Sequence, residues 1–234
     1  MFAHAGKKWS YCAPFCCRGV YMKKLFALVV VAGLIYQFKP EWIPFTQPEG
    51  AFYVDGSPRT LLFTFSDCRQ PCAKVKDELK RRGAAFEEVV VDASAENRQL
   101  WDSFSPYNSF PLLIAGKERV YGDMGIEVAT ALALNYGEDS LTSEERELTS
   151  SHFNADGSPR VVMYGADWCP HCKKLRGEFR DDGMAFSEID VEKAYNRDQL
   201  IRTLGINGYP VTYVGYRRVV GNDIKAIKKA LASY

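Results

Sequence analysis

The pattern of apolar and polar positions predicts the same succession of elements twice along the chain. In the second copy, residues 160–164 are rich in β-branched and aromatic residues, which is typical of a strand. Residues 170–180 carry apolar side chains at helical spacing, with Leu175 and Phe179 on one face. The remaining predicted elements are a strand over 186–191, a helix over 197–204, two strands over 211–214 and 218–220, and a helix over 223–231.

The order of these elements, βαβαββα, constrains the fold. The first two strands need a crossover connection, and the last two form a hairpin around a turn at Gly215. A sheet that contains both connections is mixed, and helices cover its faces. The predicted fold class is therefore α/β, with a mixed four-stranded sheet flanked by helices in each copy.

An internal repeat supports two tandem units. The pentapeptide DGSPR at 55–59 recurs at 156–160, and the same offset of 101 residues carries Cys68 onto Cys169. Two single-residue gaps then align later landmarks, among them Phe86 with Phe186, Pro111 with Pro210 and Gly122 with Gly221. The repeat predicts one unit over 53–136 and a second over 152–234. For the acidic segment 137–151 between them, we expect a solvated linker helix.

A continuous apolar run over 25–36, directly after Lys23 and Lys24, dominates the N-terminal region. A basic segment followed by an apolar run of this length is typical of an export signal. The run is short for a membrane span, but flanking lysines and aromatic residues favour an uncleaved signal anchor over 22–38, with a cleaved signal peptide as the alternative. We therefore expect membrane contact through residues 25–38.

The anchor predicts where the rest of the chain lies. Both units are expected on the extracytoplasmic side, in the periplasm if the source is bacterial, and an exported soluble form is the alternative. Residues 1–21 are interpreted as a mis-assigned start before Met22 or as a cytoplasmic tail. Residues 39–52 contain three prolines and are expected to form an extended linker.

Composition and charge narrow the function classes. Hydrophobic residues make up 47% of the chain and charged residues 25%, which excludes a wholly disordered chain. The formal net charge of +1 gives no electrostatic indication of nucleic-acid binding. Seven cysteines are too few for a small disulfide scaffold but sufficient for redox chemistry or one metal site.

The segment Trp168-Cys169-Pro170-His171-Cys172 lies where the first strand of the second unit meets its first helix. A helix N-terminus favours an anion, so we expect Cys169 to have a lowered pKa and to act as the attacking thiolate. Cys172, one helical turn later, is predicted to be more shielded and to act as the resolving thiol. A partly cationic His171 would further stabilise the thiolate, although an exposed spacer is the other interpretation.

Two other interpretations of this cysteine pair remain. Zinc binding normally needs a second pair of ligands, and Cys68 and Cys72 have poor spacing for that role. A purely structural disulfide would close too short a loop to stabilise the fold much. We therefore predict no metal site.

The second unit resembles the glutaredoxins, a family of the thioredoxin-fold superfamily. The residues that carry the resemblance span the unit in the family's order: Met163-Tyr164-Gly165, Trp168-Cys169-Pro170-His171-Cys172-Lys173, Glu188-Ile189-Asp190, Gly208-Tyr209-Pro210-Val211 and Gly221-Asn222-Asp223.

The resemblance implies a thiol–disulfide oxidoreductase with no tightly bound cofactor and with glutathione as a candidate co-substrate. It implies that Pro210 is a cis-proline beside the sulfurs and that the Tyr209 backbone pairs with a thiol substrate. It also implies that Asp223, near Gly221, helps to hold glutathione. Together with Trp168, these residues form the predicted substrate-binding set: Trp168, Tyr209, Gly221 and Asp223.

The unit departs from the family at three places. Ala166 stands where glutaredoxins usually have a basic residue, and Asp167 follows it. His171 replaces the common tyrosine, and Gly208-Tyr209 replaces Thr-Val before the proline. These departures predict that glutathione reacts with the site without being held tightly, and that protein thiols or disulfides are the better substrates.

The first unit has a longer motif, Asp67-Cys68-Arg69-Gln70-Pro71-Cys72, at the equivalent position. Its cysteines can still form a bridge if Cys68 lies in the loop before the helix. Pro111 matches the cis-proline position. A second redox pair is the favoured interpretation, while a degenerate partner-positioning copy and a Cu(I) site are the alternatives.

The sequence as a whole predicts dithiol–disulfide exchange at Cys169 and Cys172, with Cys68 and Cys72 as an atypical second pair. The alternative is a metal-handling or scaffolding protein that uses the fold as a binding platform.

Overall fold

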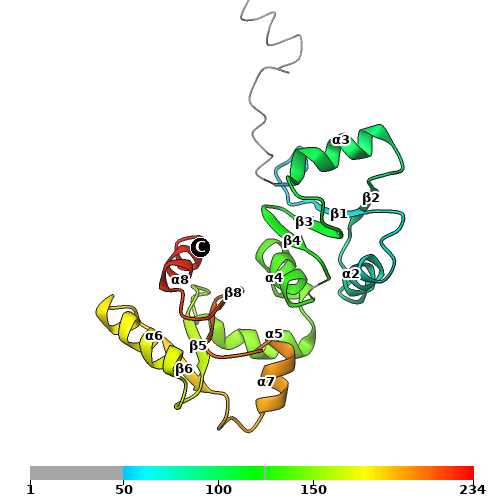
Figure 1. The fold of residues 1–234 in the computed structure, drawn as a ribbon. Coiled ribbons are helices and arrows are strands. Elements are labelled where there is room, and N and C mark those ends of the chain that lie inside the picture. The colour runs from blue at the N-terminus through cyan, green and yellow to red at the C-terminus, as the bar shows by residue number, and fades with distance from the viewer. Residues whose placement is uncertain (1–49, 124) are drawn as a thin grey trace, which may run out of the picture. The chain divides into compact units, whose positions relative to one another are not determined.

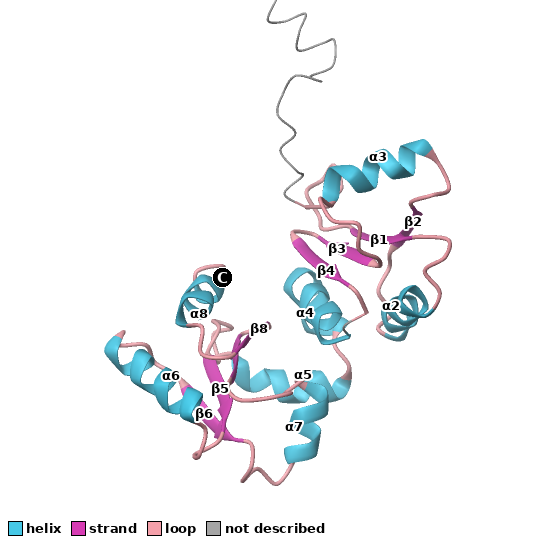
Figure 2. Cartoon of the chain, viewed as in Figure 1, coloured by secondary structure: helices cyan, strands magenta, loops and turns pink. Residues whose placement is uncertain are grey.

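The computed structural model describes residues 50–123 and 125–234. They form two four-stranded sheets, each with its own helices (Figures 1 and 2). The predicted anchor over 22–38, the N-terminal segment 1–21 and most of the linker 39–52 lie outside the described residues. None of the helices in the described part of the chain is both long and apolar enough to cross a membrane.

The first sheet has the strand order β2-β1-β3-β4, in which β2 is parallel to β1 and the other neighbours are antiparallel. Its strands are β1 (Thr60–Thr64), β2 (Glu87–Val90), β3 (Leu112–Ala115) and β4 (Glu118–Tyr121), and its helices are α2 (Gln70–Arg81), α3 (Ala95–Phe104) and α4 (Gly125–Tyr136). Ala51 is buried and its amide donates to the Gly116 carbonyl oxygen at 2.8 Å, so the packed region includes the end of the predicted linker.

The second sheet repeats this topology, with the order β6-β5-β7-β8. Its strands are β5 (Val161–Gly165), β6 (Ser187–Asp190), β7 (Val211–Val214) and β8 (Arg217–Val220), and its helices are α6 (Pro170–Asp181), α7 (Arg197–Thr203) and α8 (Ile224–Leu231). The prediction of two tandem α/β units with mixed sheets is confirmed.

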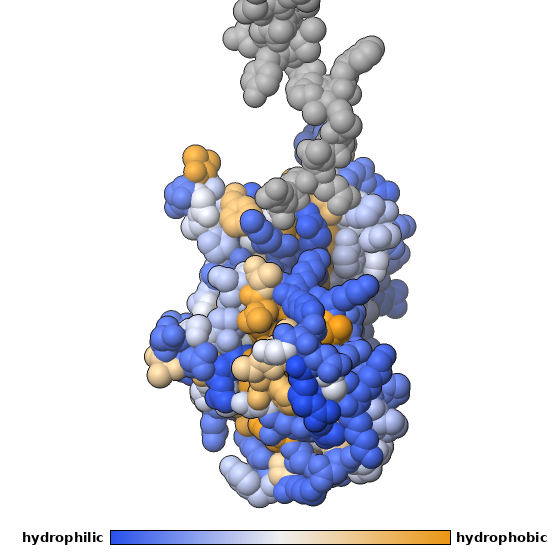
Figure 3. Space-filling model, turned by 90° about the vertical axis from the view of Figure 1, so that its left-hand side faces the viewer, coloured by the Kyte–Doolittle hydropathy of each residue, from blue (hydrophilic) through white to orange (hydrophobic). Residues whose placement is uncertain are grey.

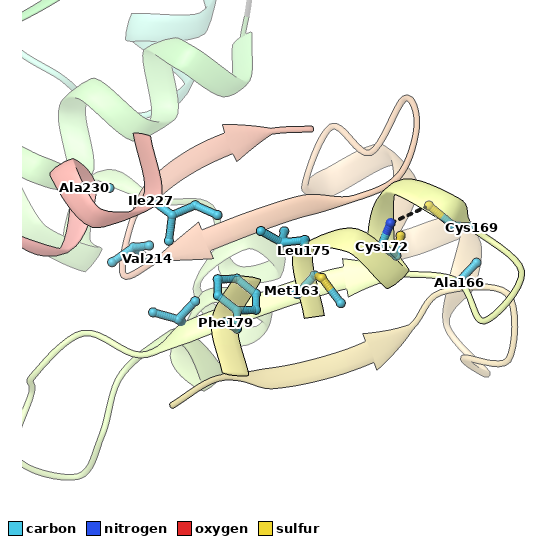
Figure 4. Packing of buried hydrophobic residues seen from close by; sticks show 10 residues of the cluster. Met163, Ala166, Cys169, Cys172, Leu175, Phe179, Val214, Ile227 and Ala230 are labelled. Atoms are coloured by element: carbon cyan, nitrogen blue, oxygen red, sulfur yellow. Dashed lines mark hydrogen bonds between the residues drawn. The ribbon is translucent and has the colours of Figure 1, made fainter. Parts of the chain in front are cut away.

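Alternating side chains of each central strand pack on opposite faces of the sheet. In the second unit, Met163 packs with Leu175 and Phe179 of α6 and with Ile227 of α8, as Figure 4 shows. The next residue, Tyr164, belongs to the cluster on the other face, with Leu200 of α7. Hydrophilic residues predominate on the surface drawn in Figure 3, with hydrophobic residues in small groups between them.

The expectation of a solvated helix over 137–151 is wrong in one respect. A helix is present, α5 (Ser143–Thr149), between the short 3₁₀ turns η1 (Gly137–Ser140) and η2 (Ser150–His152). However, Glu145 and Thr149 are buried, and Glu145 forms an ion pair with Arg82 of the first unit. The acidic composition does not reveal this, because the partner lies far away in the sequence.

Candidate active site

The cysteine pair of the second unit lies at the N-terminus of α6, directly after the loop that follows β5. Cys169 is the N-cap residue, and its Sγ accepts a hydrogen bond from the Cys172 amide at 3.1 Å (Figure 4). Its own amide donates to the Ala166 carbonyl oxygen at 3.2 Å. Pro170 follows at the first helical position, where the missing N–H costs nothing. An amide that points at Sγ at a helix N-terminus stabilises negative charge on that sulfur.

The two thiols differ in how deeply they are buried. Both are free, and the exposed fraction is 3% for Cys169 and 0% for Cys172. Burial, followed by a side-chain hydrogen bond with Cys169, raises the pKa of Cys172 to about 12. Cys169 is therefore slightly more accessible than Cys172, and Cys172 holds its thiol proton strongly.

Two aromatic residues and a proline are the next members of the predicted site. The Tyr209–Pro210 peptide bond is cis, as the resemblance implied. Trp168 is 66% exposed, and its ring meets the Tyr209 ring edge-to-face, with 6.1 Å between centroids. The Tyr209 hydroxyl donates to the Glu192 carboxylate at 3.0 Å. Trp168 therefore presents an exposed ring directly before Cys169 in the chain, and the half-buried Tyr209 packs against that ring.

The predicted glutathione-holding residues are connected to the same proline. The Gly221 amide donates to the Pro210 carbonyl oxygen at 2.8 Å, and Gly221 has a φ of 80°, which favours glycine. Asp223 is the N-cap of α8, where its carboxylate accepts a hydrogen bond from the Ala226 amide at 3.0 Å. The Asp223 carboxylate thus already has a structural role, which limits its freedom to bind a ligand.

Two cations that the sequence did not single out, Arg176 and Lys193, pair with acidic residues of the motif segments. Arg176 donates to both oxygens of Glu188, at 2.7 and 2.6 Å. Lys193 pairs with Asp167, and its hydrogen bond and charge lower the pKa of that carboxyl group. His171, by contrast, has an exposed side chain. The helical spacing of Cys172 and Arg176 was the one sequence signal available, because residues four apart share a helix face.

The first unit has a cysteine pair at the equivalent position, and its two cysteines are joined by a disulfide. Cys68 and Cys72 form a disulfide with 5.6 Å between their Cα atoms, and Cys68 lies in the loop before α2, as the sequence required. The Phe110–Pro111 bond is cis, and the Gly122 amide donates to the Pro111 carbonyl oxygen at 2.9 Å. Across residues 50–123 and 125–234, no three His, Cys, Asp or Glu side chains are grouped so that they could hold a metal ion.

A mixed sheet with a cysteine at the start of its first helix and a cis-proline directly before its third strand defines a thioredoxin-fold protein. The family model named Glutaredoxin matches twice, over residues 60–120 and 161–219, which together make up about half of the chain. The chain therefore belongs to the glutaredoxin family, and the two matches coincide with the two sheets.

Similar proteins agree with this assignment. A glutaredoxin of Pseudomonas aeruginosa is 32% identical over 74 residues, which are 31% of this chain and 88% of that protein. A thioredoxin domain-containing protein of Acanthamoeba polyphaga mimivirus is 26% identical over 103 residues, which are 38% of this chain but only 30% of the viral protein. The chain thus spans less than a third of the viral relative.

Among solved structures, a glutaredoxin from Archaeoglobus fulgidus aligns with 28% identity and a TM-score of 0.29, over 32% of this chain and 89% of that one. A glutaredoxin from Methanosarcina mazei Go1 aligns with 22% identity and a TM-score of 0.28, over 34% of this chain and 95% of that one.

Proposed function

We propose that the chain is a thiol–disulfide oxidoreductase in which Cys169 and Cys172 carry out dithiol–disulfide exchange. The observation that carries the proposal is the hydrogen bond from the Cys172 amide to Cys169 Sγ at the start of α6. This contact stabilises a Cys169 thiolate, which is the form that attacks a disulfide.

The exchange proceeds in two steps. The Cys169 thiolate attacks one sulfur of a substrate disulfide, so that a mixed disulfide forms and the other substrate sulfur leaves as a thiol. Cys172 then attacks the Cys169 sulfur, which releases the second substrate thiol and leaves a Cys169–Cys172 disulfide. A reducing thiol returns the pair to its free state. Substrate disulfides are reduced in this direction and oxidised in the reverse one.

Protein thiols or disulfides are the proposed substrates, with glutathione as a weakly held co-substrate. The exposed ring of Trp168, with the half-buried ring of Tyr209 against it, offers a surface for a protein chain. Ala166 provides no cation for a glutathione carboxylate, and Asp223 is engaged as a helix cap. Cys68 and Cys72 are proposed as a second redox pair.

Two cysteine variants test the proposed reaction. Cys169→Ser removes the nucleophile and is expected to abolish turnover of a small disulfide substrate. Cys172→Ser retains the nucleophile and is expected to trap substrates as mixed disulfides on Cys169, detectable by mass spectrometry. The proposal is wrong if both variants retain full activity.

Membrane anchoring through residues 25–38, with both units outside the cytoplasm, remains a proposal based on the sequence. A reporter fused after Tyr234 tests it. A reporter that is active only outside the cytoplasm supports the proposed topology, and one that is active only inside contradicts it.

A further inference from the structure

The loop that precedes β1 carries three consecutive exposed apolar residues. Phe52 is 40% exposed, Tyr53 is 51% exposed and Val54 is fully exposed. Isolated apolar side chains are common on protein surfaces, whereas contiguous ones mark sites that contact another molecule or a membrane. The apolar patch over residues 52–54 therefore needs a reason, either in the fold of the loop or in a partner.

Backbone groups and Asp55 hold this loop in shape. The Tyr53 amide donates to the Ser57 carbonyl oxygen, and the Gly56 amide donates to the Tyr53 carbonyl oxygen, both at 2.9 Å. The Asp55 carboxylate accepts hydrogen bonds from the Ser57 amide at 2.9 Å and from its hydroxyl at 2.6 Å. These bonds can form with other side chains at positions 52–54, so the shape of the loop does not explain the apolar patch.

The second unit forms the same loop without an apolar patch. The Asn154 amide donates to the Ser158 carbonyl oxygen at 2.8 Å, which repeats the contact of the first unit. Asn154 and Ala155 stand in place of the last two residues of the patch. Phe153, the counterpart of the first patch residue, is only partly exposed, and its ring centroid lies 4.7 Å from that of Tyr216. The apolar patch is therefore specific to the first unit.

The chain before the patch indicates what covers it. The proposed anchor ends at residue 38, and only the eleven residues 39–49 separate it from Gly50, where the described chain begins. Eleven extended residues span at most about 36–40 Å, so a bilayer that holds the anchor is within reach of the patch. Because the two are tethered, the contact is intramolecular, and a weak apolar interaction is sufficient to populate it.

The composition of the patch fits the interfacial region of a bilayer, where aromatic rings with a polar end are favoured. Tyr53 is oriented by Arg59, whose guanidinium carbon lies 5.8 Å from the centre of its ring. Hydrogen bonds from Arg59 and, more weakly, from Tyr53 lower the pKa of the Glu87 carboxyl group. Asp55 directly follows the patch, and its charge restricts insertion to the interface, because a charge in the hydrocarbon region is costly.

We propose that residues 52–54 contact the surface of the lipid bilayer in which residues 25–38 are anchored, so that this loop of the first unit is held against the membrane. The inference rests on the proposed anchoring and is independent of the proposed exchange reaction. The equivalent loop of the second unit, with Asn154 and Ala155, lacks the apolar side chains for such a contact.

Photo-crosslinking to lipid tests the contact directly. The full chain is reconstituted in phosphatidylcholine vesicles that contain a phosphatidylcholine with a diazirine next to its headgroup, and mass spectrometry locates the lipid adducts. Residues 153–155 of the same molecule are the internal control, because their loop has the same fold. We expect residues 52–54 to carry roughly tenfold more adducts than residues 153–155, since an apolar surface is what holds a loop in the interface.

Two matched variants test whether the apolar side chains cause the contact. Val54→Asp places a charge in the patch and should lower the number of adducts on residues 52 and 53 roughly fivefold, because the charge keeps the loop out of the interface. Ala155→Asp makes the same change in the second unit and should leave the adducts on residues 52–54 unaltered. Both positions are exposed, so neither variant disturbs the core.

Flotation of the vesicles separates failure of the inference from failure of the anchoring. If the chain floats with the vesicles and carries adducts within residues 25–38, but residues 52–54 and 153–155 are labelled equally, the inference is overturned and a protein, either a second copy or a partner, becomes the better occupant. A chain that neither floats nor carries adducts within residues 25–38 would refute the anchoring and the inference with it. Neither result affects the proposed exchange at Cys169.

Discussion

Lys193 forms an ion pair with Asp167, two residues before Cys169, and its Nζ also lies 3.4 Å from a carboxylate oxygen of Asp190. In the sequence, Asp167 was noted only as an acidic residue that follows Ala166. The structure shows that Lys193 neutralises the Asp167 charge, and that this ion pair holds the Lys193 ammonium group. Ala166, which stands where glutaredoxins usually have a basic residue, is fully buried, so it has no route to an anionic ligand.

We predict that Asp167→Ala improves the use of a glutathionylated substrate. Without Asp167, Lys193 is released to attract a substrate carboxylate, so the KM should fall roughly two- to fivefold while kcat stays the same. Because both residues are exposed, the change should disappear at high ionic strength. Steady-state kinetics at low and high salt measure it.

The double variant Asp167→Ala/Lys193→Ala is the control. It lacks the released cation and should return the KM to at least the wild-type value. An unchanged KM in Asp167→Ala at low salt would show that Lys193 does not reach the substrate.

We also predict that Trp168 favours protein substrates over small ones. Trp168→Ala removes a large exposed ring beside Cys169, so the KM for a protein disulfide should rise roughly three- to tenfold, while a small aliphatic disulfide is reduced at an unchanged rate. Tyr107→Ala is the matched control, because Tyr107 is an aromatic residue of the first unit with a similar exposed fraction, 64%. Equal effects on both substrates would contradict the prediction.

A third prediction concerns the ion pair between Arg82 of the first unit and Glu145 of α5. The Arg82 side chain is 1% exposed and donates to both oxygens of Glu145, at 2.6 and 2.5 Å. Glu145→Gln leaves a buried guanidinium with less compensation, so the free energy of unfolding should fall by about 2–3 kcal/mol. Denaturant unfolding measures this loss.

Glu87→Gln provides the comparison for that variant. Its partner Arg59 is partly exposed, and water replaces the lost contact, so the cost should stay below about 1 kcal/mol. If the two variants lose equal stability, the burial of Arg82 does not decide the strength of the pair.

The strands and helices of the second unit could be predicted from the sequence because each buries one face within the unit itself. Leu175 and Phe179 define the inner face of α6 by their spacing alone. Glu145 could not be understood in this way, because its partner Arg82 is 63 positions away and only the fold brings them together. Helical periodicity therefore predicts that a helix is present, but it does not show which residues contact the polar face of that helix.

The candidate active site could also be predicted only in part from the sequence. The cysteines, the cis-proline and its neighbours follow a motif and could be found in the sequence. The ion pair of Glu188 with Arg176 depends on the register between β5 and β6, in which Glu188 pairs with Met163. The need for glycine at residue 165 was equally hidden, because only the structure shows that a Cβ atom there would lie 3.0 Å from Cys172 Sγ.

The last prediction concerns His152, which is fully buried, with Nε2 2.8 Å from the Tyr164 hydroxyl oxygen and its ring stacked on Tyr213. Burial lowers the pKa of His152 from 6.5 to about 4. The unfolded chain therefore binds this proton more readily than the folded one, and stability should fall as the pH drops below about 6.5 and level off near pH 4, by up to about 3 kcal/mol. Urea unfolding across this range measures the slope. His152→Gln should flatten it, and an equally steep slope in that variant would contradict the assignment.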